Sequence, residues 1–213
     1  MADTARGRRV PAVPAPLPPT AEAPPESLQA LLPAVLAVGE KYHYDAAHGR
    51  QVASLAGQLF SALQPFHGLP ATWRLPLEHA ALLHDTGYFV AARGHHRHSR
   101  YLIRRDSLLD EYPAPWRELV ALVAANHRRR VRRGPRAWGH ERRRGATVLS
   151  AILRLADGLD YGHDGAARVD GVRVRRGTLQ IRVTGLRPQD LRPVLRRKAG
   201  LFARIFAVPV SFV

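Results

Sequence analysis

Hydrophobic positions between residues 27 and 164 recur with the spacing of amphipathic helices. The stretches DAAHGRQVASLAGQLF, WRLPLEHAALLH and SAILRLADGLD place apolar residues three and four positions apart. HHRHSRYLIRRDSLL and WRELVALVAANHRRR show the same period. Gly87 is expected to end the helix formed by the second of these stretches, because glycine readily terminates helices. The pattern predicts a helical domain over residues 27–164.

The period changes after Gly165. VDGVRVRRGTLQIRVTG alternates apolar and basic residues on both sides of Arg176 and Gly177, which predicts a β-hairpin. DLRPVLRRKAGLFARIFA then predicts a helix, and VPVSFV a last strand. We therefore expect a mainly α fold with a small α+β C-terminal appendage at residues 165–213. This appendage is expected to act as a structural cap, or alternatively as a basic hairpin that extends an anion-binding surface.

Residues 1–26 contain seven prolines amid alanine and predict a disordered arm, because proline removes backbone donors and resists helix formation. The early arginines precede prolines instead of the apolar segment of a secretory signal. No stretch approaches the roughly 20 apolar residues that a membrane helix needs. We expect a cytoplasmic protein that does not associate with membranes.

His84 and Asp85 place an imidazole and a carboxylate side by side at the end of an apolar helix. Burying both groups unpaired would cost several kcal/mol, whereas a metal ion would satisfy both. His48 and Asp157 interrupt apolar stripes in two other predicted helices. The absence of cysteine excludes a thiolate zinc site. Nitrogen and oxygen ligands suit Mn, Fe, Ni, Zn or Mg, so the predicted cofactor is one or two of these divalent ions.

The ordered set of His, then His-Asp, then Asp resembles the HD superfamily of metal-dependent phosphohydrolases. More narrowly, YHYDAAHGRQVASLAGQLF, HAALLHDTGYFV, HHRHSRYLI, NHRR and ILRLADGLD resemble the C-terminal region of the exopolyphosphatase and guanosine pentaphosphate phosphohydrolase (Ppx/GppA) family, over roughly residues 28–213. This resemblance implies an HD-domain helical bundle. It also implies that His48, His84, Asp85 and Asp157 hold a metal ion that hydrolyses a phosphate ester or anhydride.

Binuclear members of the superfamily bind a second metal through further histidines, and here the resemblance points to His95 and His127. His95 shares a helical face with Ser99 and can point inward. His96 and His98 are close enough in sequence to compete for the role. A helix cap or a packed core residue is the alternative interpretation of His127.

Arg128 follows His127 directly and matches the His-Arg pair of the family. We expect its guanidinium to grip a substrate phosphate and to neutralise developing charge, while Asp85 bridges the two ions. The other arginines of residues 128–133 and 142–144 are expected to lie in a solvated loop. Candidate substrate-binding residues or supports of the ligands are Arg97, His98, Arg100, Asp160, Tyr161 and His163.

The formal net charge of +16 favours anionic partners, such as a phosphate-rich small molecule or polyphosphate. Nucleic acid would also be attracted, but no recognition helix or aromatic stacking platform is apparent. Only two residues are lysine, and alanine, proline and glycine are abundant, so a GC-rich genome offers a second explanation of the basicity. A homodimer is compatible with the sequence.

Full-length relatives in the resembling family carry an actin-like phosphohydrolase portion with glycine-rich phosphate loops. These 213 residues contain no such loops, so that family's exopolyphosphatase activity is not carried over. Two functions stay open: hydrolysis by the HD metal site, or a non-catalytic accessory module that binds polyphosphate or a nucleotide. The complete ligand set favours hydrolysis.

Overall fold

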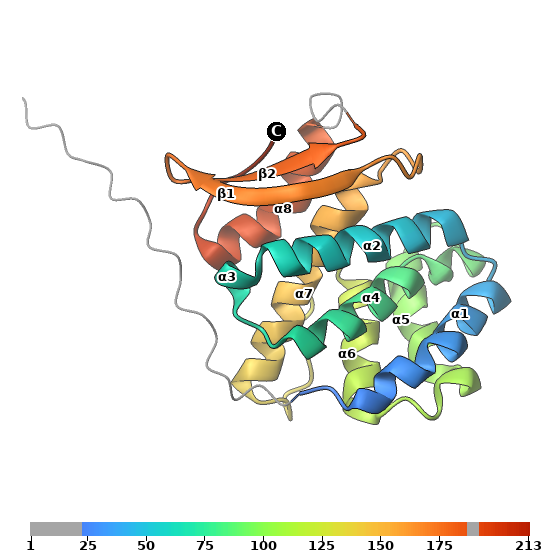
Figure 1. The fold of residues 1–213 in the computed structure, drawn as a ribbon. Coiled ribbons are helices and arrows are strands. Elements are labelled where there is room, and N and C mark those ends of the chain that lie inside the picture. The colour runs from blue at the N-terminus through green and yellow to red at the C-terminus, as the bar shows by residue number, and fades with distance from the viewer. Residues whose placement is uncertain (1–22, 187–191) are drawn as a thin grey trace, which may run out of the picture.

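The computed structural model describes residues 23–186 and 192–213. A 3-10 turn at Glu26–Leu31 leads into the helical part (Figure 1). Its helices are α1 (Leu32–Lys41), α2 (Ala46–Ala62), α3 (Gln64–His67), α4 (Arg74–Leu83), α5 (His95–Arg105), α6 (Ala114–Ala125) and α7 (His140–Leu159). The expected mainly α fold is confirmed.

The core of the helical part forms where the apolar faces of α2, α4, α6 and α7 meet. Leu55 and Leu59 of α2 and Leu77 of α4 are fully buried, and each such side chain contributes about 1.5–3 kcal/mol of hydrophobic stabilisation. Trp73 and Trp116 pack edge to face, with ring centroids 5.1 Å apart. This contact joins the start of α4 to the start of α6.

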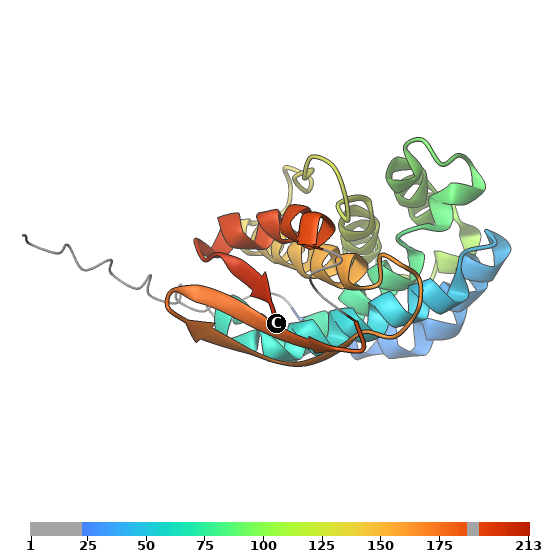
Figure 2. The same ribbon diagram turned by 90° about the horizontal axis from the view of Figure 1, so that it is seen from above.

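The C-terminal part consists of a three-stranded sheet and α8 (Arg192–Phe206). β1 (Arg168–Arg175) and β2 (Thr178–Thr184) form the predicted antiparallel hairpin, with Arg176 and Gly177 as its turn. β3 (Val210–Phe212) confirms the predicted last strand and pairs in parallel with β2. Figure 2 shows the hairpin beside α2, and α8 runs along α7.

One continuous cluster of buried apolar side chains joins the two parts of the chain. It includes Ile181 of β2 and Phe202 of α8 together with the core residues of the helices. The division at residues 164 and 165 into two units stays a prediction. Residues 1–22 of the predicted arm lie outside the described residues.

Three predicted helix ends were wrong. The helix predicted over residues 95–109 ends at Arg105, before a 3-10 turn at Ser107–Leu109. The helix before Asp85 ends at Leu83 instead of Gly87, which lies in a 3-10 turn at Thr86–Phe89. α6 ends at Ala125, so His127 lies just beyond the helix instead of on its apolar stripe. Of the helices in residues 23–186 and 192–213, none is both long and apolar enough to cross a membrane.

Candidate metal centre

The turn after α4 presents His84 and Asp85 to the start of α5. The Ser99 hydroxyl of α5 donates to the His84 carbonyl (2.6 Å) and accepts the Gly87 N–H (2.9 Å). A Cβ atom on Gly87 would lie 2.1 Å from the His95 carbonyl oxygen, so only glycine allows α5 to approach so closely. This contact brings His95 beside Asp85.

Asp85 lies between four histidines, and each of its oxygens faces two of them. Its Oδ2 lies 3.4 Å from His84 Nε2 and 3.9 Å from His48 Nε2. Its Oδ1 lies 3.3 Å from His95 Nε2 and 3.6 Å from His127 Nε2. A carboxylate in this position can serve two neighbouring cations at once.

The potential ligands form two groups, in each of which the ligand atoms lie within 4.8 Å of one another. The first cluster comprises His48, His84 and Asp157, and the second cluster comprises Asp85, His95 and His127. His48 comes from the first turn of α2, where Asp45 caps the helix by accepting the His48 N–H (3.0 Å).

Hydrogen bonds fix the orientation of all four rings. The Nδ1 atom of His84 donates to the Ala81 carbonyl (2.7 Å). In the same way, His95 Nδ1 donates to the Ala92 carbonyl (3.1 Å) and His127 Nδ1 to the Ala124 carbonyl (2.7 Å). Since a carbonyl oxygen only accepts, the neutral form of each of these rings carries hydrogen on Nδ1 and a lone pair on Nε2. His48 Nδ1 binds Asp160 Oδ2 (2.8 Å) in the same manner. Backbone or carboxylate partners of this kind are typical of metal-binding histidines.

The resulting lone pairs point into the centre, where the guanidinium of Arg128 is a donor to one of them, with its Nη1 3.3 Å from His95 Nε2. His95 Nε2 and His127 Nε2 lie 3.1 Å apart, so two acceptors face each other. His48 Nε2, His84 Nε2 and Asp85 Oδ1 are buried without a hydrogen-bond partner among the described residues. Buried acceptors left in this state are costly, and a cation would satisfy them together. The residues therefore fit a divalent metal.

Burial keeps these rings in the form that binds metal. It lowers the pKa of His48 and of His95 below the ordinary histidine value, and lowers that of His127 well below it. Neighbouring His84 lowers the pKa of His48 and His127 further. All three rings are therefore predominantly neutral near pH 7, with a lone pair available.

Asp157 in the last turn of α7 forms an ion pair with Lys198 of α8. Burial alone would raise the pKa of Asp157, but the Lys198 ammonium brings it below its ordinary value. Asp157 is therefore a carboxylate in the folded protein.

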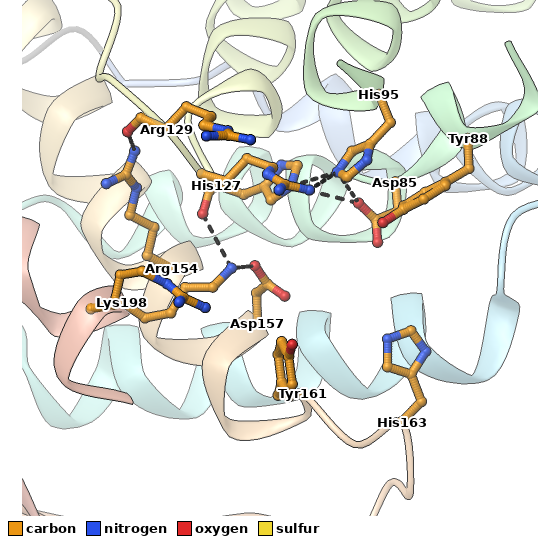
Figure 3. Close-up of a pocket in the computed structure, with 12 residues that line it drawn as sticks. Asp85, Tyr88, His95, His127, Arg129, Arg154, Asp157, Tyr161, His163 and Lys198 are labelled. Carbon is orange, nitrogen blue, oxygen red and sulfur yellow. Dashed lines mark hydrogen bonds and ion pairs between the residues drawn. The ribbon is translucent and has the colours of Figure 1, made fainter. Parts of the chain in front are cut away.

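A pocket of about 760 Å³ opens onto the centre (Figure 3). Asp85, His95, His127 and Asp157 line one part of it. Five cations form the basic side of the pocket: Arg128, Arg129, Arg154, Arg197 and Lys198. Tyr88, Tyr161 and His163 complete the lining. The pocket thus joins potential metal ligands to a surface suited to phosphate oxygens.

Arg154 fixes the loop that follows α6. Its guanidinium donates to the carbonyls of Asn126 and Arg129, at 2.6 Å each. The Asn126 side chain in turn pairs with the backbone of Arg132 (2.8 and 3.0 Å). Burial lowers the pKa of Arg154 to about 10, so the side chain stays charged at neutral pH. These contacts hold His127 and the following arginines at the pocket.

The structure brings the six predicted ligands together, and Arg128, Tyr161 and His163 line the same pocket. Asp160 lies behind His48 as its hydrogen-bond partner. Arg97, His98 and Arg100 are not among the described residues that line the pocket. Arg100 pairs instead with Glu118 (2.5 Å).

Sequence reasoning missed Tyr88, Arg129, Arg154, Arg197 and Lys198. Arg154 carried a usable signal, because it lies one turn before Asp157 and interrupts the same apolar stripe. Lys198 is one of only two lysines in a chain with 33 basic residues, which also set it apart. No feature of the sequence separates Arg129 and Arg197 from their basic neighbours.

The family model described as Ppx/GppA phosphatase, domain III, matches residues 33–184, which is more than half of the chain. The matched range contains both clusters and the hairpin. No curated protein matches the chain.

Proposed function

Because the chain belongs to the Ppx/GppA phosphatase domain III family, we propose that it is a metal-dependent phosphohydrolase of a phosphate ester or anhydride. One observation carries the proposal: four Nε2 lone pairs converge on the two oxygens of Asp85, and three of these atoms, His48 Nε2, His84 Nε2 and Asp85 Oδ1, are buried with no hydrogen-bond partner among the described residues. A purely structural centre would need no such arrangement.

The two clusters divide the proposed work of binding. His48, His84 and Asp157 would hold one ion, and His95 and His127 a second, with Asp85 shared between them. The nitrogen and oxygen donors suit Mn, Fe, Ni, Zn or Mg. Divalent ions supply Lewis acidity toward a phosphoryl oxygen and acidify bound water enough to yield a nucleophile near neutral pH.

The basic side of the pocket would bind and orient the substrate. Arg128 already points at the second cluster, where its Nη1 lies 3.3 Å from His95 Nε2. A guanidinium presents paired donors that match two phosphate oxygens, so Arg128 can hold a phosphoryl group beside the ligands. Such fixed charge stabilises the negative oxygens of the transition state more than those of the ground state.

The test compares metal content and phosphate release in matched variants of the full chain. Elemental mass spectrometry on protein purified without chelator should find one or two transition metal ions in the wild type. These ions should be absent from the double variant His84→Ala, Asp85→Ala. The control is His140→Ala, Glu141→Ala, which removes a surface pair of the same chemistry (3.3 Å) and should keep the metal.

Phosphate release from p-nitrophenyl phosphate, polyphosphate and nucleoside triphosphates is then measured with each divalent ion. We expect turnover in at least one combination and its loss, together with the metal, in Asp85→Ala. Unchanged turnover in Asp85→Ala would contradict the mechanism.

A non-catalytic module for binding anions is the second candidate, favoured by one observation. Lys198 already neutralises Asp157, and four arginines line the pocket beside it, so phosphate oxygens could bind there without any metal. This function predicts polyphosphate binding that weakens steeply with salt, with no phosphate release in any divalent ion.

A further inference from the structure

The ammonium of Lys198 lies beside Asp157, the carboxylate of the first cluster. Its Nζ forms an ion pair with Asp157 Oδ2 and lies 3.4 Å from the His127 carbonyl oxygen (Figure 3). The two side chains of the pair are only 13% and 11% exposed, so water contributes little to their stabilisation. The chain thus carries its own positive charge into the proposed metal centre.

Asp157 needs this charge when no metal is bound. Its neighbours in the first cluster are the rings of His48 and His84, whose inward Nε2 atoms are acceptors without hydrogen. A buried carboxylate beside acceptors alone is strongly unfavourable, and a paired ammonium removes that penalty.

The packing of α8 on α7 gives the lysine a path to the carboxylate. The Lys198 stem crosses α7 at Gly158, where a Cβ atom would lie only 3.1 Å from Lys198 Cγ. Glycine beside the ligand Asp157 therefore leaves room for the side chain. The path belongs to the interface between the helical part and the C-terminal part.

We propose that Lys198 is a tethered cation that occupies Asp157 in the metal-free protein and competes with a divalent ion for that carboxylate. The inference rests on the metal centre of the proposed function and adds a residue from the C-terminal part to it. Lysine suits the role because its compact charge sits on a flexible stem and can withdraw. Arginine, which supplies all but two of the basic residues, would clamp both carboxylate oxygens and leave none for the ion.

The test measures the affinity of chelator-treated full-length protein for Zn²⁺ and Mn²⁺ by titration calorimetry. Lys198→Met keeps the stem and removes the charge, so affinity at the first cluster should rise about 10- to 100-fold, the scale of outer-shell effects on metal binding. Lys198→Gln should change affinity in the same direction. Arg197→Met is the matched control: it removes the neighbouring pocket charge and should leave affinity close to that of the wild type.

Thermal unfolding provides a readout that does not depend on catalysis. Metal-free Lys198→Met should unfold at a lower temperature than the wild type, because Asp157 loses its partner. Saturating metal should then raise its midpoint by more than it raises that of the wild type. Arg197→Met should show neither difference.

The outcomes separate this inference from the proposed function. If Lys198→Met binds metal no more tightly than the wild type, or if Arg197→Met gains as much, the competition is refuted while a metal-dependent hydrolase stays viable. Metal uptake by Lys198→Met, but not by the wild type, would support the competition and count against metal-dependent hydrolysis by the wild type. Failure of every variant to take up metal would overturn both proposals.

Discussion

Gly87→Ala is the sharpest perturbation of the second cluster, because it adds one methyl group between Asp85 and α5. The new Cβ would lie 2.1 Å from the His95 carbonyl oxygen and 2.4 Å from the Ser99 amide nitrogen. Both are backbone atoms, so no change of side-chain rotamer can relieve the clash. The start of α5 must therefore move away from the turn.

The size of the movement follows from these distances. Restoring an ordinary contact of 3.4 Å to the His95 oxygen requires a shift of roughly 1 Å, and such overpacking costs about 1–3 kcal/mol of folding stability. Metal–ligand distances tolerate only about 0.2 Å of error. Because His95 moves with α5, the second cluster should lose its ion while the first cluster keeps its own.

Elemental analysis and titration calorimetry would measure this loss. In a wild type that binds two ions, Gly87→Ala should bind one. Gly139→Ala is the control, because no described heavy atom lies within 4 Å of a Cβ atom at that position. Two ions bound with wild-type affinity in Gly87→Ala would refute the argument that this glycine positions His95.

Two further predictions concern residues outside the ligand set. Arg154→Met removes the hydrogen bonds to the Asn126 and Arg129 carbonyls. The free energy of unfolding in urea should therefore fall by about 2–4 kcal/mol, and the affinity for metal at the second cluster should fall with it. Unchanged values of both would exclude a supporting role for Arg154. His79 is fully buried and its pKa is lowered to about 4, below the unfolded value of 6.5, so the unfolded state binds the proton first. Stability should therefore hold above pH 6.5 and decline as pH falls toward 4, by up to about 3 kcal/mol from this residue. His79→Gln should flatten that decline in urea unfolding at pH 7 and 4.5, and an identical slope would contradict the assignment.

The helical period was sufficient to predict the fold class, because apolar stripes must face a common core. The same period singled out Asp157 and His48 as candidate site residues, since an ionisable residue on an apolar face needs a partner. Helix ends were harder to predict. Gly87 resembled a terminator, yet what matters at that position is the backbone of α5, a contact twelve residues away that local sequence does not encode.

The contribution of the C-terminal part to the pocket was beyond prediction for a related reason. The basic hairpin drew attention, but the cations that reach the pocket from this part are Arg197 and Lys198 of α8. Their position depends on how α8 packs along α7, which no periodicity specifies. The rarity of lysine among so many arginines was the available clue. The role of Lys198 could be inferred only once the structure placed it beside Asp157.

The charges at the centre follow a consistent physical logic. The inward-facing atoms are almost all acceptors: four imidazole nitrogens and the oxygens of Asp85 and Asp157. Such a set is stable only beside positive charge, which Lys198 and Arg128 supply from opposite clusters. Divalent ions would bind the same acceptors more strongly and release both side chains toward the pocket, where substrate phosphates would be their next partners. The competition for Asp157 would thus couple metal loading to readiness for an anionic substrate.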